Sequence, residues 1–194
     1  MAKARNGSGA RPVAIELLES DHRHVEALLD QYESEKEGDD GTKRAIAMQI
    51  CAELTAHAQL EEELFYPWLR ENLDEEQMEM LEEAYVEHAS AKDLIAQIEG
   101  ASDIGPEYDA KVKVLGEYVK HHVQEEENEI FKEVRDMQDE LDELGQEMHA
   151  RKAELMEELG LMQEEEEGEE EEGMAAGASR GRARSRQGEQ RGAR

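Results

Sequence analysis

Two stretches of this sequence repeat each other around a histidine and a glutamate four residues apart. The first reads His57-Ala-Gln-Leu-Glu61 and continues Glu-Glu-Leu-Phe-Tyr. The second reads His122-Val-Gln-Glu-Glu126 and continues Glu-Asn-Glu-Ile-Phe. A further histidine lies 35 residues before the first stretch and 34 before the second. Because residues i and i+4 share one side of an α-helix, the repeat predicts two matched helix hairpins related by a pseudo-twofold axis.

The spacing alone is a weak signal, because acidic residues fill 51 of 194 positions and would place such pairs after about two of the seven histidines by chance; four such pairs occur. The position of the histidines is more informative. His22, His57, His88 and His122 each lie in the apolar stripe of a different predicted helix. Burying an unpaired imidazole is costly, so four such stripes indicate one shared polar centre rather than four core histidines paired with glutamates.

Good helix formers dominate the composition, and there are only three prolines. The apolar periodicity predicts helices that begin near Pro12, Thr42, Asp74 and Pro106, and a fifth over residues 139–159. Thr42 is expected to cap the second of these helices. The predicted fold class is all-α: an antiparallel up-down four-helix bundle with a short fifth helix and a disordered C-terminal tail. We expect Phe65 and Trp68 to close one end of the bundle.

The domain organisation follows from shifts in composition. Residues 1–11 are predicted to be a disordered N-terminus and residues 12–160 the helical bundle. Residues 161–194, with eight glutamates followed by six arginines and almost no apolar side chain, are predicted to be a disordered tail. This tail is expected to be a solubilising segment. The alternative is that its arginines contact nucleic acid, an acidic partner or another protein.

The net charge of −29 excludes binding to nucleic acid or to an anionic membrane through the general field of the protein, and it favours cations. The single cysteine, Cys51, cannot form an intrachain disulfide and is expected to be a small buried side chain. No run of 18 apolar residues is present, so no membrane span is expected. These features predict a soluble, cytoplasmic protein.

Four imidazoles and two carboxylates without a thiolate favour iron, and less strongly manganese, over a structural zinc site. A carboxylate has two oxygens, so a glutamate one turn after a histidine can bridge two ions. The predicted cofactor is a pair of iron ions, oxo- or hydroxo-bridged, with coordination positions left for an outside ligand. The predicted metal ligands are His22, His57, Glu61, His88, His122 and Glu126.

The pattern resembles the hemerythrin-like (HHE cation-binding) domain family over residues 12–160. Asp21-His22-Arg23 and the glutamate-rich run that ends Leu-Phe-Tyr-Pro carry the resemblance. It implies a four-helix bundle with a non-haem di-iron centre and the same six ligands. Two features depart from the family's oxygen carriers: Lys92 stands where they have a further histidine, and the acid on the fourth helix follows at i+4 rather than i+5. The resemblance therefore implies a reactive or sensing centre rather than an oxygen store, with Tyr118 or Tyr85 as a candidate extra ligand.

Three functions remain open at this point. The first is a di-iron protein that binds or senses dioxygen, iron or redox state, and the second is a di-iron enzyme that handles peroxide or nitric oxide. The third is a metal-free acidic interaction module. The remaining histidines, His24, His121 and His149, are expected to lie outside the ligand set.

Overall fold

The computed structural model describes residues 11–35, 38–75 and 77–161, and its regular structure within them is helical throughout. The N-terminus and the tail that were expected to be disordered lie outside these residues, apart from Arg11 and Leu161. The elements are α1 (Val13–Ser34), α2 (Asp40–Leu60), η1 (Glu61–Phe65), α3 (Tyr66–Asn72), α4 (Met78–Glu99), α5 (Pro106–Glu125), η2 (Glu126–Ile130), α6 (Phe131–Val134) and α7 (Gln138–Glu158).

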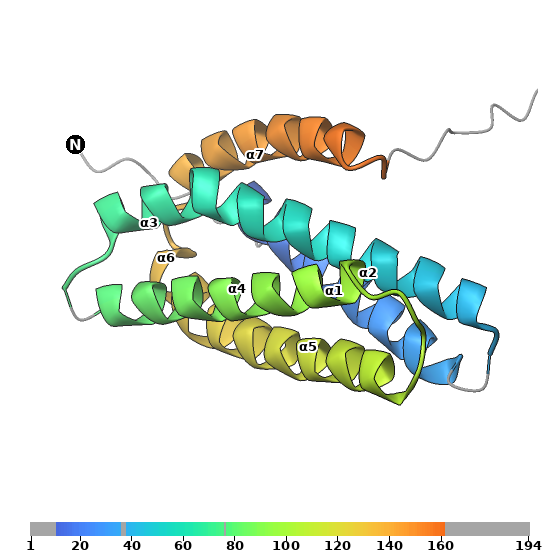
Figure 1. The fold of residues 1–194 in the computed structure, drawn as a ribbon. Coiled ribbons are helices and arrows are strands. Elements are labelled where there is room, and N and C mark those ends of the chain that lie inside the picture. Colours follow the sequence, from blue (N-terminus) through green and yellow to red (C-terminus); the bar gives the residue numbers. More distant parts are fainter. Residues whose placement is uncertain (1–10, 36–37, 76, 162–194) are drawn as a thin grey trace, which may run out of the picture. The chain divides into compact units, whose positions relative to one another are not determined.

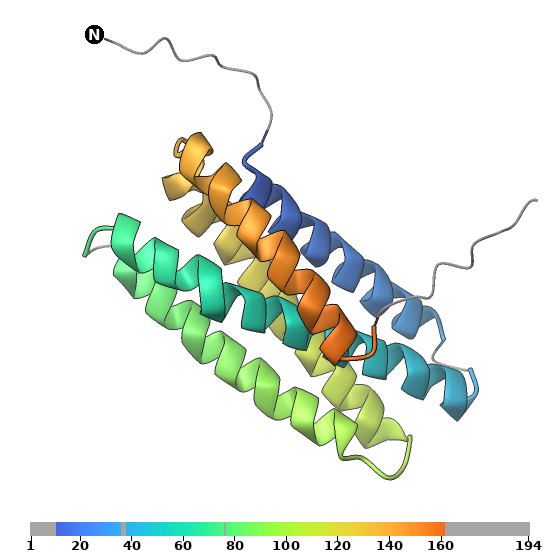
Figure 2. The same ribbon diagram turned by 90° about the horizontal axis from the view of Figure 1, so that it is seen from above.

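Four long rods form an antiparallel bundle (Figure 1). Helix α2 runs through η1 into α3 as one rod, and α5 runs through η2 into α6 as another; α1 and α4 complete the four. Helix α7 has 21 residues and packs on α1 and α2, as the view from above shows (Figure 2). The all-α fold class, with four bundle helices and a fifth helix outside them, is confirmed.

The helix starts follow local capping chemistry. Asp39 precedes α2, and its Oδ1 accepts a hydrogen bond from the backbone N–H of Thr42 at 3.0 Å. Thr42 is therefore inside the helix, and the expectation that it caps this helix was wrong. Before α4, Asp74 and Gln77 exchange side-chain to backbone hydrogen bonds of 3.0 and 2.9 Å, a capping box.

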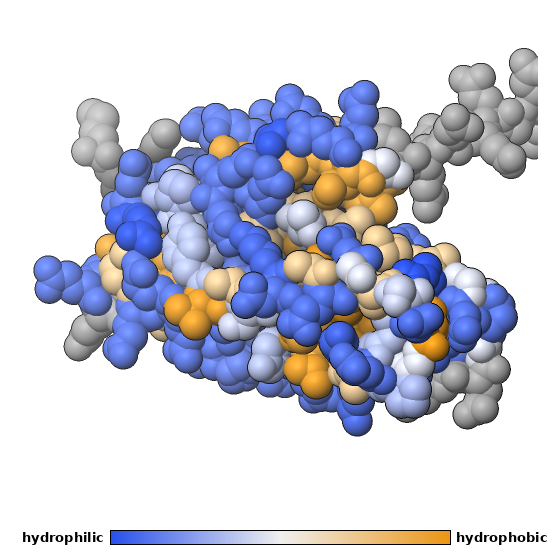
Figure 3. Space-filling model, viewed as in Figure 1, coloured by the Kyte–Doolittle hydropathy of each residue, from blue (hydrophilic) through white to orange (hydrophobic). Residues whose placement is uncertain are grey.

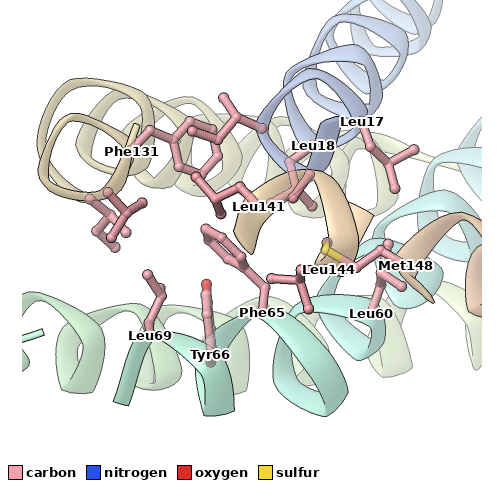
Figure 4. Close-up of a cluster of buried hydrophobic side chains, with 14 of the residues drawn as sticks. Leu17, Leu18, Leu60, Phe65, Tyr66, Leu69, Phe131, Leu141, Leu144 and Met148 are labelled. Carbon is pink, nitrogen blue, oxygen red and sulfur yellow. The ribbon is translucent and has the colours of Figure 1, made fainter. Parts of the chain in front are cut away.

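The apolar core consists of two clusters, one toward each end of the bundle. The cluster in Figure 4 joins η1, η2, α1 and α7 around two fully buried rings, Phe65 and Phe131, whose centroids are 5.7 Å apart. Phe65 also stacks on Trp68 at 6.4 Å, consistent with the expected closure of this end. Six buried histidines and glutamates, none of them in either cluster, form the polar layer described below.

The surface seen in Figure 3 is largely hydrophilic, with hydrophobic residues in separate patches. Cys51 is buried, as expected. Within the part of the chain that the structure describes, no helix combines the length and the apolar character needed to cross a membrane.

Candidate metal centre

The bundle brings all six predicted ligands together at its centre. Each of them is at most 8% exposed, and Glu61 and Glu126 are fully buried. His22 and His57 face each other with Nε2 atoms 3.2 Å apart, as do His88 and His122. Glu61 Oε2 lies 3.3 Å from both His57 Nε2 and His88 Nε2, and therefore touches both histidine pairs.

The second buried glutamate also spans the two pairs. Glu126 Oε2 lies 3.1 Å from His22 Nε2 and 3.9 Å from His122 Nε2. Two donor groups result, which share Glu61. One contains His22, His57, Glu61 and Glu126, and the other contains Glu61, His88 and His122.

These separations suit coordination of a common ion. Ligand atoms about 2.1 Å from one metal lie about 3.0 Å apart at right angles and about 3.4 Å apart in a tetrahedron. All but one of the distances above fall between 3.1 and 3.3 Å. The donors are therefore arranged at ligand spacing around two neighbouring points, with Glu61 between them.

The buried carboxylates are unsatisfied by the protein itself. None of the four carboxylate oxygens of Glu61 and Glu126 has a hydrogen-bond partner among the residues that the structure describes. Burial, together with the charge of Glu126, raises the pKa of Glu61 well above its usual value. Buried polar atoms are normally paired, and two buried carboxylates side by side repel each other. Cations between them would satisfy both requirements.

The buried environment also shifts the pKa values of the ligand histidines. Burial alone would lower the pKa of His22, but the carboxylates of Glu126 and Glu127 outweigh it and raise the pKa to about 10. Burial lowers the pKa of His57 to about 4, against the opposing effect of Asp21. The Nε2 atoms of His22 and His57 are 3.2 Å apart and cannot both carry a proton, so at least one of them presents a free lone pair to the centre.

Each of the two fully buried glutamates, Glu61 and Glu126, which we call the inner glutamates, begins a turn of π-helix. The backbone N–H of Tyr66 donates to the carbonyl of Glu61, and that of Phe131 donates to the carbonyl of Glu126, five residues back in both cases. Pro67, which lacks an N–H, favours the first of these turns, but residue 132 is a lysine, so proline is not the common cause. Single π-turns inside α-helices often mark functional sites, and here they occur at equivalent positions of the repeat.

Every inward-facing histidine presents its other ring nitrogen to an acidic side chain. We call these four residues the outer carboxylates: Asp21, Glu62, Glu87 and Glu127. Three Nδ1 atoms lie within 3.0 Å of a carboxylate oxygen, and His57 Nδ1 lies 3.6 Å from Asp21. An Nδ1–H that donates to a carboxylate leaves the Nε2 lone pair free to bind a metal, and it fixes the ring.

The outer carboxylates obey the same pseudo-twofold symmetry as the ligands. Asp21 and Glu87 directly precede a ligand histidine and face the next histidine of their own hairpin. Glu87 lies 2.9 Å from His122 Nδ1, whereas Asp21 lies 3.6 Å from His57 Nδ1, beyond hydrogen-bond distance. Glu62 and Glu127 directly follow an inner glutamate and hold the first histidine of the other hairpin. The outer carboxylates were not predicted from the sequence, although they lie at equivalent positions of the repeat.

Lys92 is one of the cations that neutralise the outer carboxylates. Its Nζ lies 2.6 and 2.7 Å from the two carboxylate oxygens of Glu62, and its side chain is 43% exposed. Lys92 therefore lies beside Glu62, the carboxylate that contacts His88, and not among the donor groups. Arg23 pairs with Glu127, and Lys152 of α7 pairs with Asp21.

A tyrosine approaches the centre, but it is not one of the two that were expected. Tyr66 is fully buried, and its hydroxyl lies 3.3 Å from His88 Nε2. Tyr118 is 46% exposed, and Tyr85 packs its ring against Tyr66 at 5.1 Å. Tyr66 follows the inner glutamate by five residues, a spacing that α-helical periodicity does not bring to the same face; the π-turn does so.

A small cavity adjoins the four histidines on the side of the apolar cluster that contains Val25, Leu54 and Ile95. Its volume is about 40 Å³, several times the roughly 10–15 Å³ that one water requires. Apart from the ligands, outer carboxylates Asp21 and Glu87, Lys92 and Tyr118, its wall is apolar and consists of Val25, Leu54, Ala58, Ala91, Ile95, Val119 and Val123. A molecule of two or three atoms could reach the histidines there.

The remaining histidines lie outside the donor groups that contain the inner glutamates. His24 has a 52% exposed side chain and lies 3.2 Å from Glu53. His149 is exposed on α7. His121 is 60% exposed and lies 3.1 Å from Glu125 and 3.6 Å from Glu87.

Comparisons with known proteins agree with this geometry. The sequence profile described as Hemerythrin HHE cation binding domain matches residues 13–134. A protein of Nostoc sp. (strain PCC 7120) named DNA nickase is 30% identical over 157 residues, which are 79% of this chain and 43% of that protein. The chain thus spans less than half of this curated relative.

A solved structure supports the fold. It is the crystal structure of a hemerythrin HHE cation-binding domain-containing protein, the Rv2633c homolog from Mycobacterium kansasii. The two share a TM-score of 0.63 and 22% sequence identity, over 77% of this chain and 89% of that chain.

Proposed function

Since the profile covers residues 13–134, the chain belongs to the hemerythrin HHE cation-binding family, and we propose that it holds two iron ions and binds or senses dioxygen. The observation that carries the proposal is the pair of donor groups that share Glu61, with four carboxylate oxygens left unpaired among the described residues. The donors are nitrogen and oxygen only, which favours iron over a thiolate-rich zinc site.

The protein's own contribution would be to hold the donors in place. The outer carboxylates Glu62, Glu87 and Glu127 would accept the Nδ1–H of three imidazoles, so that the rings are fixed in orientation and Nε2 faces the metal. With four nitrogens and two shared carboxylates for two ions, octahedral iron would retain open positions and supply redox chemistry there. The largely apolar wall of the adjoining cavity offers few polar partners to a polar ligand, so it favours a neutral diatomic molecule.

Two alternatives are less well supported. A metal-free interaction module would leave Glu61 and Glu126 buried without partners, which is a large cost. A peroxide-handling enzyme would have to hold a polar substrate against the apolar wall, whereas nitric oxide would suit it as dioxygen does. Steady-state turnover of peroxide or nitric oxide would favour the enzyme, and a stoichiometric reaction would favour binding or sensing.

The DNA nickase activity in the name of the Nostoc relative is not proposed for this chain. The match covers 43% of that protein, and a chain with a net charge of −29 repels the DNA backbone. The location in the cytoplasm stays a prediction from the sequence.

The cavity gives a direct test of the proposal. Ala91 lines the cavity, and Ala89 lies two residues earlier on the exposed face of the same helix. Ala91→Leu should fill the cavity and slow the reaction of the anaerobically iron-loaded protein with dioxygen about tenfold, with the iron content unchanged. Ala89→Leu is the matched control. Stopped-flow absorbance measures the rate, and equal rates for the two variants would contradict this route to the centre.

A further inference from the structure

At four positions beside the centre, the two hairpins carry side chains of opposite polarity. Aligning the repeat on its ligand histidines pairs Leu17 with Glu83, because each lies five residues before one. The same alignment pairs the second-helix residues Ala56, Leu60 and Leu64 with His121, Glu125 and Glu129. Three apolar side chains and a methyl group in the first hairpin thus become three carboxylates and an imidazole in the second.

In the first hairpin this place is closed. Leu17, Ala56 and Leu60 are at most 6% exposed, and Leu64 is partly buried. They belong to the same apolar cluster as Leu141, Leu144 and Met148 of α7, which lies over α1 and α2 (Figures 2 and 4). Apolar side chains therefore close the approach to the centre at these four positions.

In the second hairpin the equivalent place is hollow and acidic. A cavity of about 40 Å³ opens between α4 and the α5–η2 rod. Five carboxylates line it, those of Glu83, Glu87, Glu125 and Glu129 and, at the inner end, Glu126; no lysine or arginine of the described residues is part of its wall. The glutamates at positions 83 and 129 are exposed, whereas those at 87 and 125 are half-buried.

The inner wall of this cavity is the metal centre itself. His122 and Glu126 both line it. Glu126 is fully buried, and neither of its carboxylate oxygens has a hydrogen-bond partner in the described part of the chain. The cavity thus joins a rim of exposed carboxylates to an unsatisfied ligand at its end.

A third donor group lies at the rim. Ligand atoms of Glu87, His121 and Glu125 all lie within 4.8 Å of one another. His121 Nε2 is 3.1 Å from Glu125 Oε1 and 3.6 Å from Glu87 Oε1. One nitrogen and two carboxylates at this spacing could hold a divalent cation while leaving it partly hydrated.

We propose that this face, which we call the ion port (Glu83, Glu87, His121, Glu125 and Glu129), is the route by which divalent iron reaches the centre. Glu87, His121 and Glu125 form its resting place. The inference rests on the proposed function, because it assumes an iron-binding centre. Clustered negative charge raises the local cation concentration and speeds capture, and Glu126 receives the ion at the inner end. Helix α7 closes the opposite side, so uptake is directed to the second hairpin.

The test compares rates of iron uptake by the full chain under anaerobic conditions. Ferrous iron is mixed with metal-free protein at low ionic strength, and a chelator trap then measures the iron that is still unbound. The port variant Glu83→Gln/Glu125→Gln/Glu129→Gln spares all ligands and outer carboxylates. The control variant Glu71→Gln/Glu143→Gln/Glu147→Gln removes the same charge from exposed positions outside the cavity.

The port variant should load iron about tenfold more slowly than the control, and both should reach the wild-type iron content. The difference should shrink at about 1 M salt, where the screening length is about 3 Å. Equal rates would overturn the port, and so would a lower final iron content, because the carboxylates would then hold the ions rather than pass them on. A wild-type chain that binds no iron would contradict the proposed function first, and the port with it.

Discussion

Each of the four buried histidines presents one ring nitrogen to the centre and the other to a carboxylate. Three of these carboxylates are in turn paired with cations: Glu62 with Lys92, Glu127 with Arg23 and Asp21 with Lys152. For His22, His88 and His122, whose Nδ1 atoms lie within 3.0 Å of a carboxylate, this arrangement fixes the tautomer and orientation of the ring before any ion binds. Residues adjacent to the ligands in sequence therefore do as much to form the site as residues that face it.

Glu62 and Glu63 offer a matched pair of variants at the residue scale. Glu62 holds His88, whereas its neighbour Glu63 pairs with Arg151 on the surface. Glu62→Gln should weaken iron binding about 10–100-fold because the His88 ring loses its charged acceptor. Glu63→Gln should leave the affinity unchanged. Competition with a chelator of known affinity measures both, and the same affinity for the two variants would show that the outer carboxylates do not support the ligands.

Regular helix geometry would not produce two features of the elements. The π-turns at Glu61–Phe65 and Glu126–Ile130 add a residue to the helical register directly after each inner glutamate. Helix α7 approaches α1 so closely that a Cβ on Gly145 would lie 2.5 Å from the backbone nitrogen of Ala14. Neither feature is visible in apolar periodicity, because periodicity reports the face of a helix and not its local winding or its distance from a neighbour.

The close approach of α7 gives a prediction at the element scale. Gly145→Ala should destabilise the fold by about 1–3 kcal/mol, because the added methyl meets backbone and must separate the helices. This effect outweighs the gain of about 1 kcal/mol in helix propensity. Gly105→Ala is the control, since nothing lies within 4 Å of its added Cβ. Urea unfolding of the metal-free proteins compares them; equal stability would mean that α7 is not packed closely on α1.

At the scale of the whole molecule, the sequence was sufficient for the bundle and for the six residues at its centre. Four amphipathic stripes predicted the helices, and the repeat made His22 and His88 equivalent residues of the two hairpins. The outer carboxylates and Tyr66 were missed, because the first are polar residues in an acid-rich sequence and the second depends on a π-turn. The boundary at Asp39 was misplaced because Thr42 is an equally good cap by composition.

The centre also predicts how stability depends on pH. The pKa values of Glu61 and His22 are both raised in the folded, metal-free protein. A raised pKa means that the folded state binds the proton more tightly, so each contribution is lost as the pH rises, above about 4.5 for the glutamate and through about 10 for the histidine. His57 has the opposite effect up to about pH 6.5, because its pKa is lowered to about 4 in the folded protein. The metal-free protein should therefore lose stability mainly between pH 6.5 and about 9, where His57 no longer offsets Glu61 and His22.

Iron should have the opposite effect, because it binds deprotonated ligands more tightly as the pH rises. The iron-induced shift in the unfolding midpoint should grow over the same pH range. Glu61→Gln should make the metal-free protein more stable at pH 7 and should abolish most of the shift. Thermal unfolding with iron and with chelator measures both effects, and an iron-induced shift that falls with rising pH would contradict the assignment of the buried pair.

The central claim is that four histidines and two glutamates hold two ions between two matched hairpins. Metal analysis of the anaerobically reconstituted chain, after removal of loosely bound iron, tests it most directly. Two iron ions per chain are expected, and close to none in a His57→Ala/His122→Ala variant. One iron or none in the unaltered chain, or full retention of iron by the double variant, would contradict it.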